Sequence, residues 1–154
     1  MALVSTIVVD LANKTVVLTA TVDSASVDVI TYDNNANQVT FDQRDGIIIS
    51  FAEFLDFVAQ VNIFQAAILA NFSGINPSSA NPFTQIMINE LHDPGQWNLT
   101  VSPHTDPDVV AYEGTKSSLK LNMLVRPSSK TLEFPEWQYF LIALNHYSRS
   151  IQQF

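Results

Sequence analysis

Several ionisable residues in the second half of the chain have the types and the spacing of metal ligands. A histidine and two carboxylates alternate in His104-Thr105-Asp106-Pro107-Asp108, and Glu90 and His92 come shortly before them. Imidazole nitrogens and carboxylate oxygens together bind divalent transition metals. Asp and Pro are also the residues of ordinary turns, because Asp hydrogen-bonds to nearby backbone amides and Pro fixes its own φ angle. We therefore expect a turn at this place, with no metal and no cofactor bound.

The other reactive residue types do not predict an enzyme. The chain has no cysteine, which excludes a thiolate nucleophile, a thiolate metal site and a disulfide framework. None of the three histidines has neighbours that mark it as a catalytic base, and no serine stands in a nucleophile-elbow sequence. The four glycines form no phosphate-binding loop. His146 lies beside the apolar positions of a predicted helix and is expected to be partly buried.

A group of cations in the second half is the strongest candidate for contact with an anionic partner. Lys120 and Arg126 fall on one face of a strand predicted over residues 119–125 and at its end, and Lys116 and Lys130 flank them. These side chains could contact the phosphates of a nucleic acid or an acidic neighbouring protein; a solvated outer sheet face shows the same alternation. The first half is more acidic, and a basic face opposite an acidic one also suits head-to-tail contacts that form rings or filaments.

The overall charge of the chain is negative and sparse. Lys and Arg number 7 against 15 Asp and Glu, a net charge of -8, while charged residues make up 14% of the chain and hydrophobic ones 47%. Ordinary soluble domains have about a quarter charged residues, so much of this surface must be uncharged. Such a surface suits burial against other subunits. It disfavours nucleic acid, whose binding depends on Lys and Arg displacing counterions.

The ends and the apolar stretches give no sign of targeting. No basic segment precedes an apolar run at the N-terminus, and Asp, Gln or Asn interrupts the longest apolar stretches. We therefore expect no signal peptide, no secretion and no membrane association.

The segments that would position these residues occur as two similar copies along the chain. Residues 50–57 return as residues 133–140, and at the same spacing six apolar positions match six apolar positions further on. Asn62 then falls on Asn145 and Glu53 on Glu136. Such self-similarity predicts an internal duplication. We divide the chain into a first repeat over residues 1–72, a linker over 73–83 and a second repeat over 84–154, packed as one domain around a shared core.

Alternation and turn residues predict the elements within each half. Ser50 and Glu53 form a capping box that begins a first helix ending near residue 71, and the second helix begins near Glu133 with Pro135 in its first turn. We therefore predict an α+β protein of two ββββα repeats related by pseudo-twofold symmetry, with antiparallel sheets and two packed helices. Extended segments are expected at residues 6–10, 15–22, 27–32, 38–41 and 46–49 in the first half, and at 85–89, 96–101, 108–112 and 119–125 in the second.

Two sets of apolar residues on the helices have functional interpretations. Aromatic residues at the helix starts could stack on bases, but repeated apolar positions there favour a core. The first helix has further apolar residues outside the stripe that it shares with the second helix, and a helix that is apolar nearly all round is buried on all sides. These further residues predict a subunit interface. The aromatic residues are Phe51, Phe54, Phe134 and Trp137, and the interface residues are Leu55, Ile63, Ala66 and Leu69.

The segment Gly-Ile-x-Ile-Ser-x-x-Glu-Phe-x-x-Phe, residues 46–57, resembles the superfamily of single-stranded-DNA-binding transcriptional coactivators and Whirly proteins, and Val27-Asp28-Val29 resembles its third-strand signature. The resemblance implies tandem ββββα units and binding of single-stranded DNA. Where that family places basic residues, this chain has Ile30 and Thr31, and later Asp42-Gln43-Arg44-Asp45, and the Lys-Gly-Lys of plant Whirly proteins is absent. A fold can persist while its ligand changes.

Three functions are open at this point. The first is a non-enzymatic structural protein that packs through subunit interfaces as a homo-oligomer or within a particle, such as a virus or phage virion, located in the virion or the host cytoplasm. The second is a single-stranded nucleic-acid-binding protein of replication or transcription that uses Lys116, Lys120, Arg126 and Lys130. The third is an acidic mimic of nucleic acid that blocks a basic groove.

Overall fold

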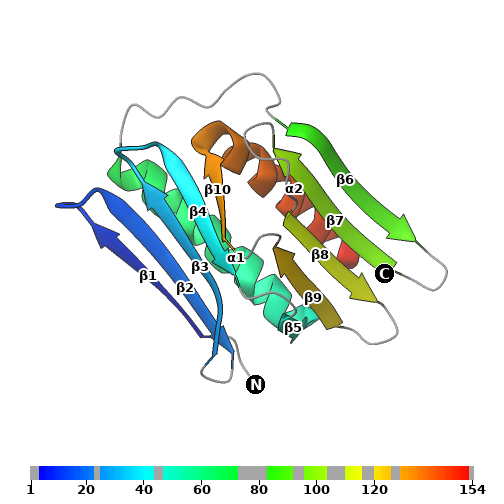
Figure 1. The fold of residues 1–154 in the computed structure, drawn as a ribbon. Helices are drawn as coiled ribbons and strands as arrows, with labels where there is room; N and C mark the ends of the chain where they lie inside the picture. The colour runs from blue at the N-terminus through cyan, green and yellow to red at the C-terminus, as the bar shows by residue number, and fades with distance from the viewer. Residues whose placement is uncertain are drawn as a thin grey trace.

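The computed structural model describes residues 4–22, 25–43, 47–72, 83–91, 96–103, 110–115, 120–125 and 129–152, and the side chains of residues 4–21, 29–40, 49–72 and 131–149. This part of the chain is an α+β protein with two antiparallel five-stranded sheets and two helices (Figure 1). The predicted fold class is thereby confirmed at the level of antiparallel sheets and two packed helices.

Five strands, where four were predicted, precede each helix. The segments 38–41 and 46–49 are separate strands because they lie in different sheets. The elements before the first helix are β1 (Val4–Asp10), β2 (Thr15–Val22), β3 (Ala25–Asp33), β4 (Gln38–Gln43) and β5 (Ile47–Ser50), followed by α1 (Phe51–Asn71). The later elements are β6 (Phe83–Leu91), β7 (Gln96–Pro103), β8 (Val110–Thr115), β9 (Lys120–Val125) and β10 (Ser129–Glu133), followed by α2 (Phe134–Gln152).

The last strand of each half joins the sheet of the other half. The first sheet has the order β1-β2-β3-β4-β10, and the second has the order β5-β9-β8-β7-β6. In the first sheet Leu132 of β10 lies opposite Val39 of β4, and in the second sheet Ile49 of β5 lies opposite Leu121 of β9. Each sheet is therefore completed by a strand from the other half, so backbone pairing links the two halves.

The helices pack on the sheets and on each other. α1 contacts β1 and β2, α2 contacts β6 and β7, and the two helices also contact one another. Figure 1 shows both sheets drawn in front of the two helices, which run in roughly opposite directions. By length and composition α1 is one described helix that could cross a membrane. Its buried residues instead lie in the core: Phe51, Phe54, Phe57, Val58, Val61, Phe64 and Ile68.

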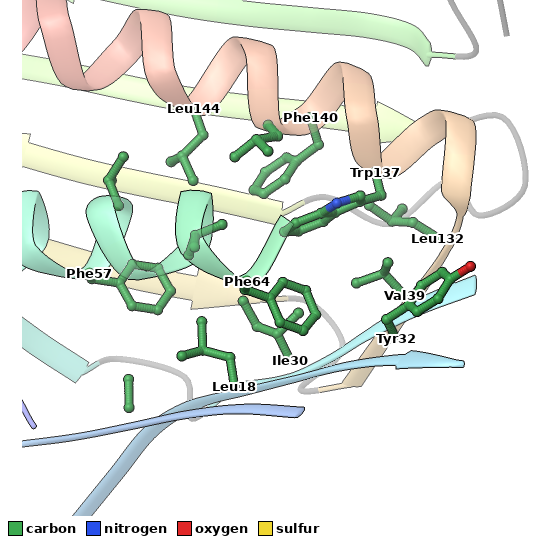
Figure 2. Close-up of a cluster of buried hydrophobic side chains, with 14 of the residues drawn as sticks. Leu18, Ile30, Tyr32, Val39, Phe57, Phe64, Leu132, Trp137, Phe140 and Leu144 are labelled. Atoms are coloured by element: carbon green, nitrogen blue, oxygen red, sulfur yellow. The ribbon is translucent and has the colours of Figure 1, made fainter. Parts of the chain in front are cut away.

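The core residues whose side chains are described lie mostly between the helices and the first sheet. Figure 2 shows Leu18 and Ile30 from the strands pointing toward Phe57 and Phe64 of α1, while Trp137 enters from α2. The Phe64 and Trp137 rings meet edge to face with centroids 5.7 Å apart. Two further edge-to-face pairs, Tyr32 with Phe134 and Phe54 with Tyr147, have centroids 5.2 and 5.8 Å apart. Such pairs stabilise a core beyond the apolar area that they bury.

The helix starts show how the two halves differ locally. At α1 the predicted capping box is confirmed: the Glu53 amide donates to Ser50 Oγ (3.1 Å) and the Ser50 amide donates to Glu53 Oε1 (3.0 Å). At α2 the Glu133 amide donates to Glu136 Oε1 (2.9 Å), and Gln38 Nε2 of β4 donates to Glu133 Oε1 (3.0 Å). Glu133 is the residue of the second half that is equivalent to Ser50, and its side chain contacts β4 in the first half.

Candidate subunit interface

The residues predicted to form a subunit interface lie on α1, and three of the four are exposed. Ile63 and Leu69 are 52% and 53% exposed, and Ala66 is exposed as well. Leu55 is half-buried and packs against the core. Exposed branched apolar side chains of this size, close together on one helix, are typical of surfaces that bind other proteins.

The exposed residues of α1 form one continuous stripe, which we call the α1 face. They recur at alternating steps of four and three residues, which keeps them on one line along a helix. The line is opposite the buried residues of α1, so it faces away from the core. Asp56 is its one charged residue. The α1 face consists of Ala52, Asp56, Ala59, Ile63, Ala66 and Ala70, with Leu69 beside it.

The matching stripe of α2, which we call the α2 face, is more polar. It consists of Tyr139, Ile142, His146 and Arg149, of which Tyr139 is half-buried and the other three are exposed. The prediction that His146 is partly buried is wrong, because this position faces solvent beside Arg149 and not the core. The outward side of α2 thus has polar residues where that of α1 has apolar ones.

A reciprocal amide pair joins the two helices between these faces. Asn62 Nδ2 donates to Asn145 Oδ1 (2.9 Å), and Asn145 Nδ2 donates to Asn62 Oδ1 (3.1 Å). Each Nδ2 also donates to the backbone carbonyl four residues earlier, Val58 (2.8 Å) and Leu141 (2.9 Å). Both side chains are half-buried. Paired polar groups in a helix contact select one register, because a shift of either helix would leave them without partners.

The edge strand β1 is a second apolar surface. Among the described strands β1 pairs with β2 alone, and its exposed side chains include Val4, Val8 and Val9, followed by Leu11 in the turn. The strand has no Lys and no Pro, the residues that commonly protect an edge from pairing with another chain. β1 is therefore open to pairing with a further strand.

Polar side chains form hydrogen bonds within the β1–β2 turn and the β3–β4 turn. Asp10 Oδ1 accepts from the amides of Ala12 and Asn13 (both 3.0 Å), and these bonds, that of Asn13 first, hold the pKa of Asp10 below its usual value. The Tyr32 hydroxyl donates to Asn34 Oδ1 (2.9 Å), and burial, helped by the charge of Asp33, raises the pKa of Tyr32. These hydrogen bonds therefore join groups that belong to the same turn or its adjoining strands.

Of the four candidate phosphate contacts, the structure describes the backbone of two, and these two lie in different sheets. Lys120 begins β9 in the second sheet, opposite Ser50, whereas Lys130 lies in β10 of the first sheet, opposite Phe41. Lys116 and Arg126 lie outside the described residues. The strands β1 to β4 contain no Lys or Arg.

The remaining candidate residues are the aromatic ones at the helix starts and the possible metal ligands. The aromatic residues Phe51, Phe54, Phe134 and Trp137 are buried in the core. His92, His104, Asp106 and Asp108 lie outside the described residues, and within the described ones no cluster of three His, Asp or Glu could hold a metal ion. Glu136 is only 2% exposed, and its carboxylate caps α2 as described above.

Comparison of the chain with protein-family models, curated proteins and solved structures gives no match.

Proposed function

We propose that this protein is a non-enzymatic structural subunit that packs through the α1 face against other subunits, as a homo-oligomer or in a particle such as a virus or phage virion. The observation that carries the proposal is the α1 face itself. Ile63 and Leu69 are about half exposed among alanines, with Asp56 as the one charge of the stripe. Burial of apolar area stabilises association by roughly 25 cal/mol per Å² before the costs of ordering, so this face favours contact with a second apolar surface.

Internal duplication supports the proposal. We infer that the two βββββα halves are related by an approximate twofold axis that passes near the Asn62 and Asn145 amides, since equivalent residues donate to each other there. Exchange of β5 and β10 between the sheets fits the same relation. The outward residues of the two helices differ, apolar on α1 and more polar on α2, and this difference favours a partner that contacts the α1 face.

The composition supports the same function. A surface with few charges remains compatible with solubility when part of it is covered, and the net charge of -8 limits unspecific aggregation. The edge strand β1, which has no Lys and no Pro, offers a further contact for an assembly.

Thiol labelling tests the proposal directly, because the chain has no cysteine of its own. Ala66→Cys places one thiol on the α1 face, and Ala36→Cys places one at an exposed turn position as the matched control. We expect the labelling rate of the Cys at position 66 to fall as protein concentration rises, while that at position 36 stays constant. Equal rates at every concentration, with sedimentation as a monomer, would contradict the proposal.

A further inference from the structure

The α1 face and the α2 face match in charge and spacing. Asp56 precedes Ile63 by seven residues on α1, and Ile142 precedes Arg149 by seven residues on α2. All four residues are exposed. Seven residues are two helical turns, about 10 Å, so the acid lies as far from its isoleucine as the base does from its own. In an antiparallel pair of helices the two isoleucines and the two charges can therefore meet together.

We infer that the partner of the α1 face is the α2 face of a second copy, with the helices antiparallel. Ile63 then packs against the partner's Ile142, and Asp56 lies against the partner's Arg149. This inference rests on the proposed function and names the partner and register of the same surface. The ion pair is at the end of the contact, so it sets orientation more than affinity.

The sizes of the remaining residues fit the same register. Ala59 falls opposite the partner's His146, and Ala66 falls opposite the partner's Tyr139. Packed helices approach to about 8–10 Å, and a small residue on one helix makes room for a large one on the other. The two faces therefore alternate small against large around the isoleucine pair.

The register also agrees with a closed dimer. The α1 segment 56–66 is centred on Val61 and the α2 segment 139–149 on Leu144, each one residue from the Asn62 and Asn145 pair. A dimer axis along the helices, close to this point, would set α1 on the partner's α2 and α2 on the partner's α1 at once. Each contact then forms twice, and the four helices make one bundle, an isologous interface that uses up both faces.

Pairing of the α1 face with itself is the competing arrangement. In the antiparallel register that keeps this stripe in contact, Asp56 faces the partner's Ala66, and Arg149 has no role. An acid buried against alanine loses water without gaining a counter-charge. Charge complementarity therefore favours α2 as the partner helix.

Charge reversal tests the pairing. Asp56→Arg and Arg149→Asp each place like charges opposite one another, whereas the double variant restores opposite charges in reversed order. Sedimentation velocity would measure the dissociation constant, with Lys14→Asp, an exposed change in the β1–β2 turn, as the control. We expect each single variant to raise the dissociation constant about tenfold or more, because like charges placed opposite each other oppose binding, and the double variant and the control to stay near wild type.

The outcomes separate this pairing from the proposed function. A self-associating wild type with no rescue in the double variant would overturn the pairing with α2 and leave assembly through the α1 face in place. A chain that stays monomeric up to submillimolar concentration would overturn both. Far-UV circular dichroism of each variant confirms that the exposed substitutions leave the fold intact.

Discussion

Removal of one partner of the Asn62 and Asn145 pair should destabilise the protein measurably. In Asn62→Ala the Asn145 Oδ1 loses its donor at 2.9 Å, and one Asn145 Nδ2 hydrogen loses its acceptor at 3.1 Å. An unsatisfied buried polar group costs about 1–3 kcal/mol. Because both asparagines are half-buried and water can reach them in part, we expect the free energy of unfolding to fall by about 1–2 kcal/mol. Urea denaturation followed by circular dichroism, at concentrations that keep the chain monomeric, measures this change.

Asn71 provides the control for this experiment. Asn71 Nδ2 donates to the Ala67 carbonyl (2.8 Å), the same backbone bond that Asn62 makes, but Asn71 is exposed. We expect Asn71→Ala to lower the free energy of unfolding by less than about 0.5 kcal/mol. Replacement of both Asn62 and Asn145 by Leu should cost less than either alanine variant alone, since no unpaired amide remains. Equal effects of Asn62→Ala and Asn71→Ala would refute a stabilising role for the cross-helix pair.

Three further results follow from the structure. Since burial raises the pKa of Tyr32, the folded state holds this proton more tightly than the unfolded state, and the free energy of unfolding should fall as pH rises above about 10; Tyr32→Phe should weaken that dependence in alkaline urea titrations. A chain cut by a protease at a site inserted between residues 73 and 82 should still elute as one species without denaturant, because β5 and β10 remain paired in the opposite sheets, and separation of the two fragments would contradict the exchange. A labelled single-stranded oligonucleotide should show no change in fluorescence anisotropy at near-physiological salt, because the net charge of -8 repels phosphate, and salt-sensitive micromolar binding would favour the nucleic-acid alternative.

Local signals in the sequence predicted the elements well. The Ser50 and Glu53 capping box placed the start of α1, and the turn residues between positions 10 and 15 placed the first hairpin. Each of these features depends on residues that are close in sequence, where hydrogen-bonding chemistry is readable without the fold. The repeat also placed Asn62 and Asn145 as equivalent residues before their contact was visible.

The partner of each fifth strand was not predictable in the same way. Ile47–Ser50 and Ser129–Glu133 are short strands, and neither sequence specifies which sheet it joins. Which sheet accepts them depends on the packing of whole halves, a long-range property. For this reason Lys130, which the sequence predicted to flank the strand of Lys120, lies in the other sheet.

The exposed apolar residues of α1 were predictable in part. An excess of apolar residues on α1 correctly suggested a face beyond the core stripe, but Leu55 lies on the side that packs against the core, and His146 lies on the outward side of α2. The direction of each residue around a helix depends on where the sheets and the second helix lie, which the sequence of one helix does not specify.

Sedimentation velocity of the wild type beside Ile63→Glu tests the central claim most directly, because Ile63 is the largest side chain at the centre of the α1 face and is 52% exposed in the single chain. The account predicts that the wild type moves to a faster-sedimenting species as its concentration rises from micromolar to submillimolar, while the variant remains a folded monomer. Identical behaviour of the two proteins, whether both associate or both stay monomeric, would contradict a role for the α1 face in assembly.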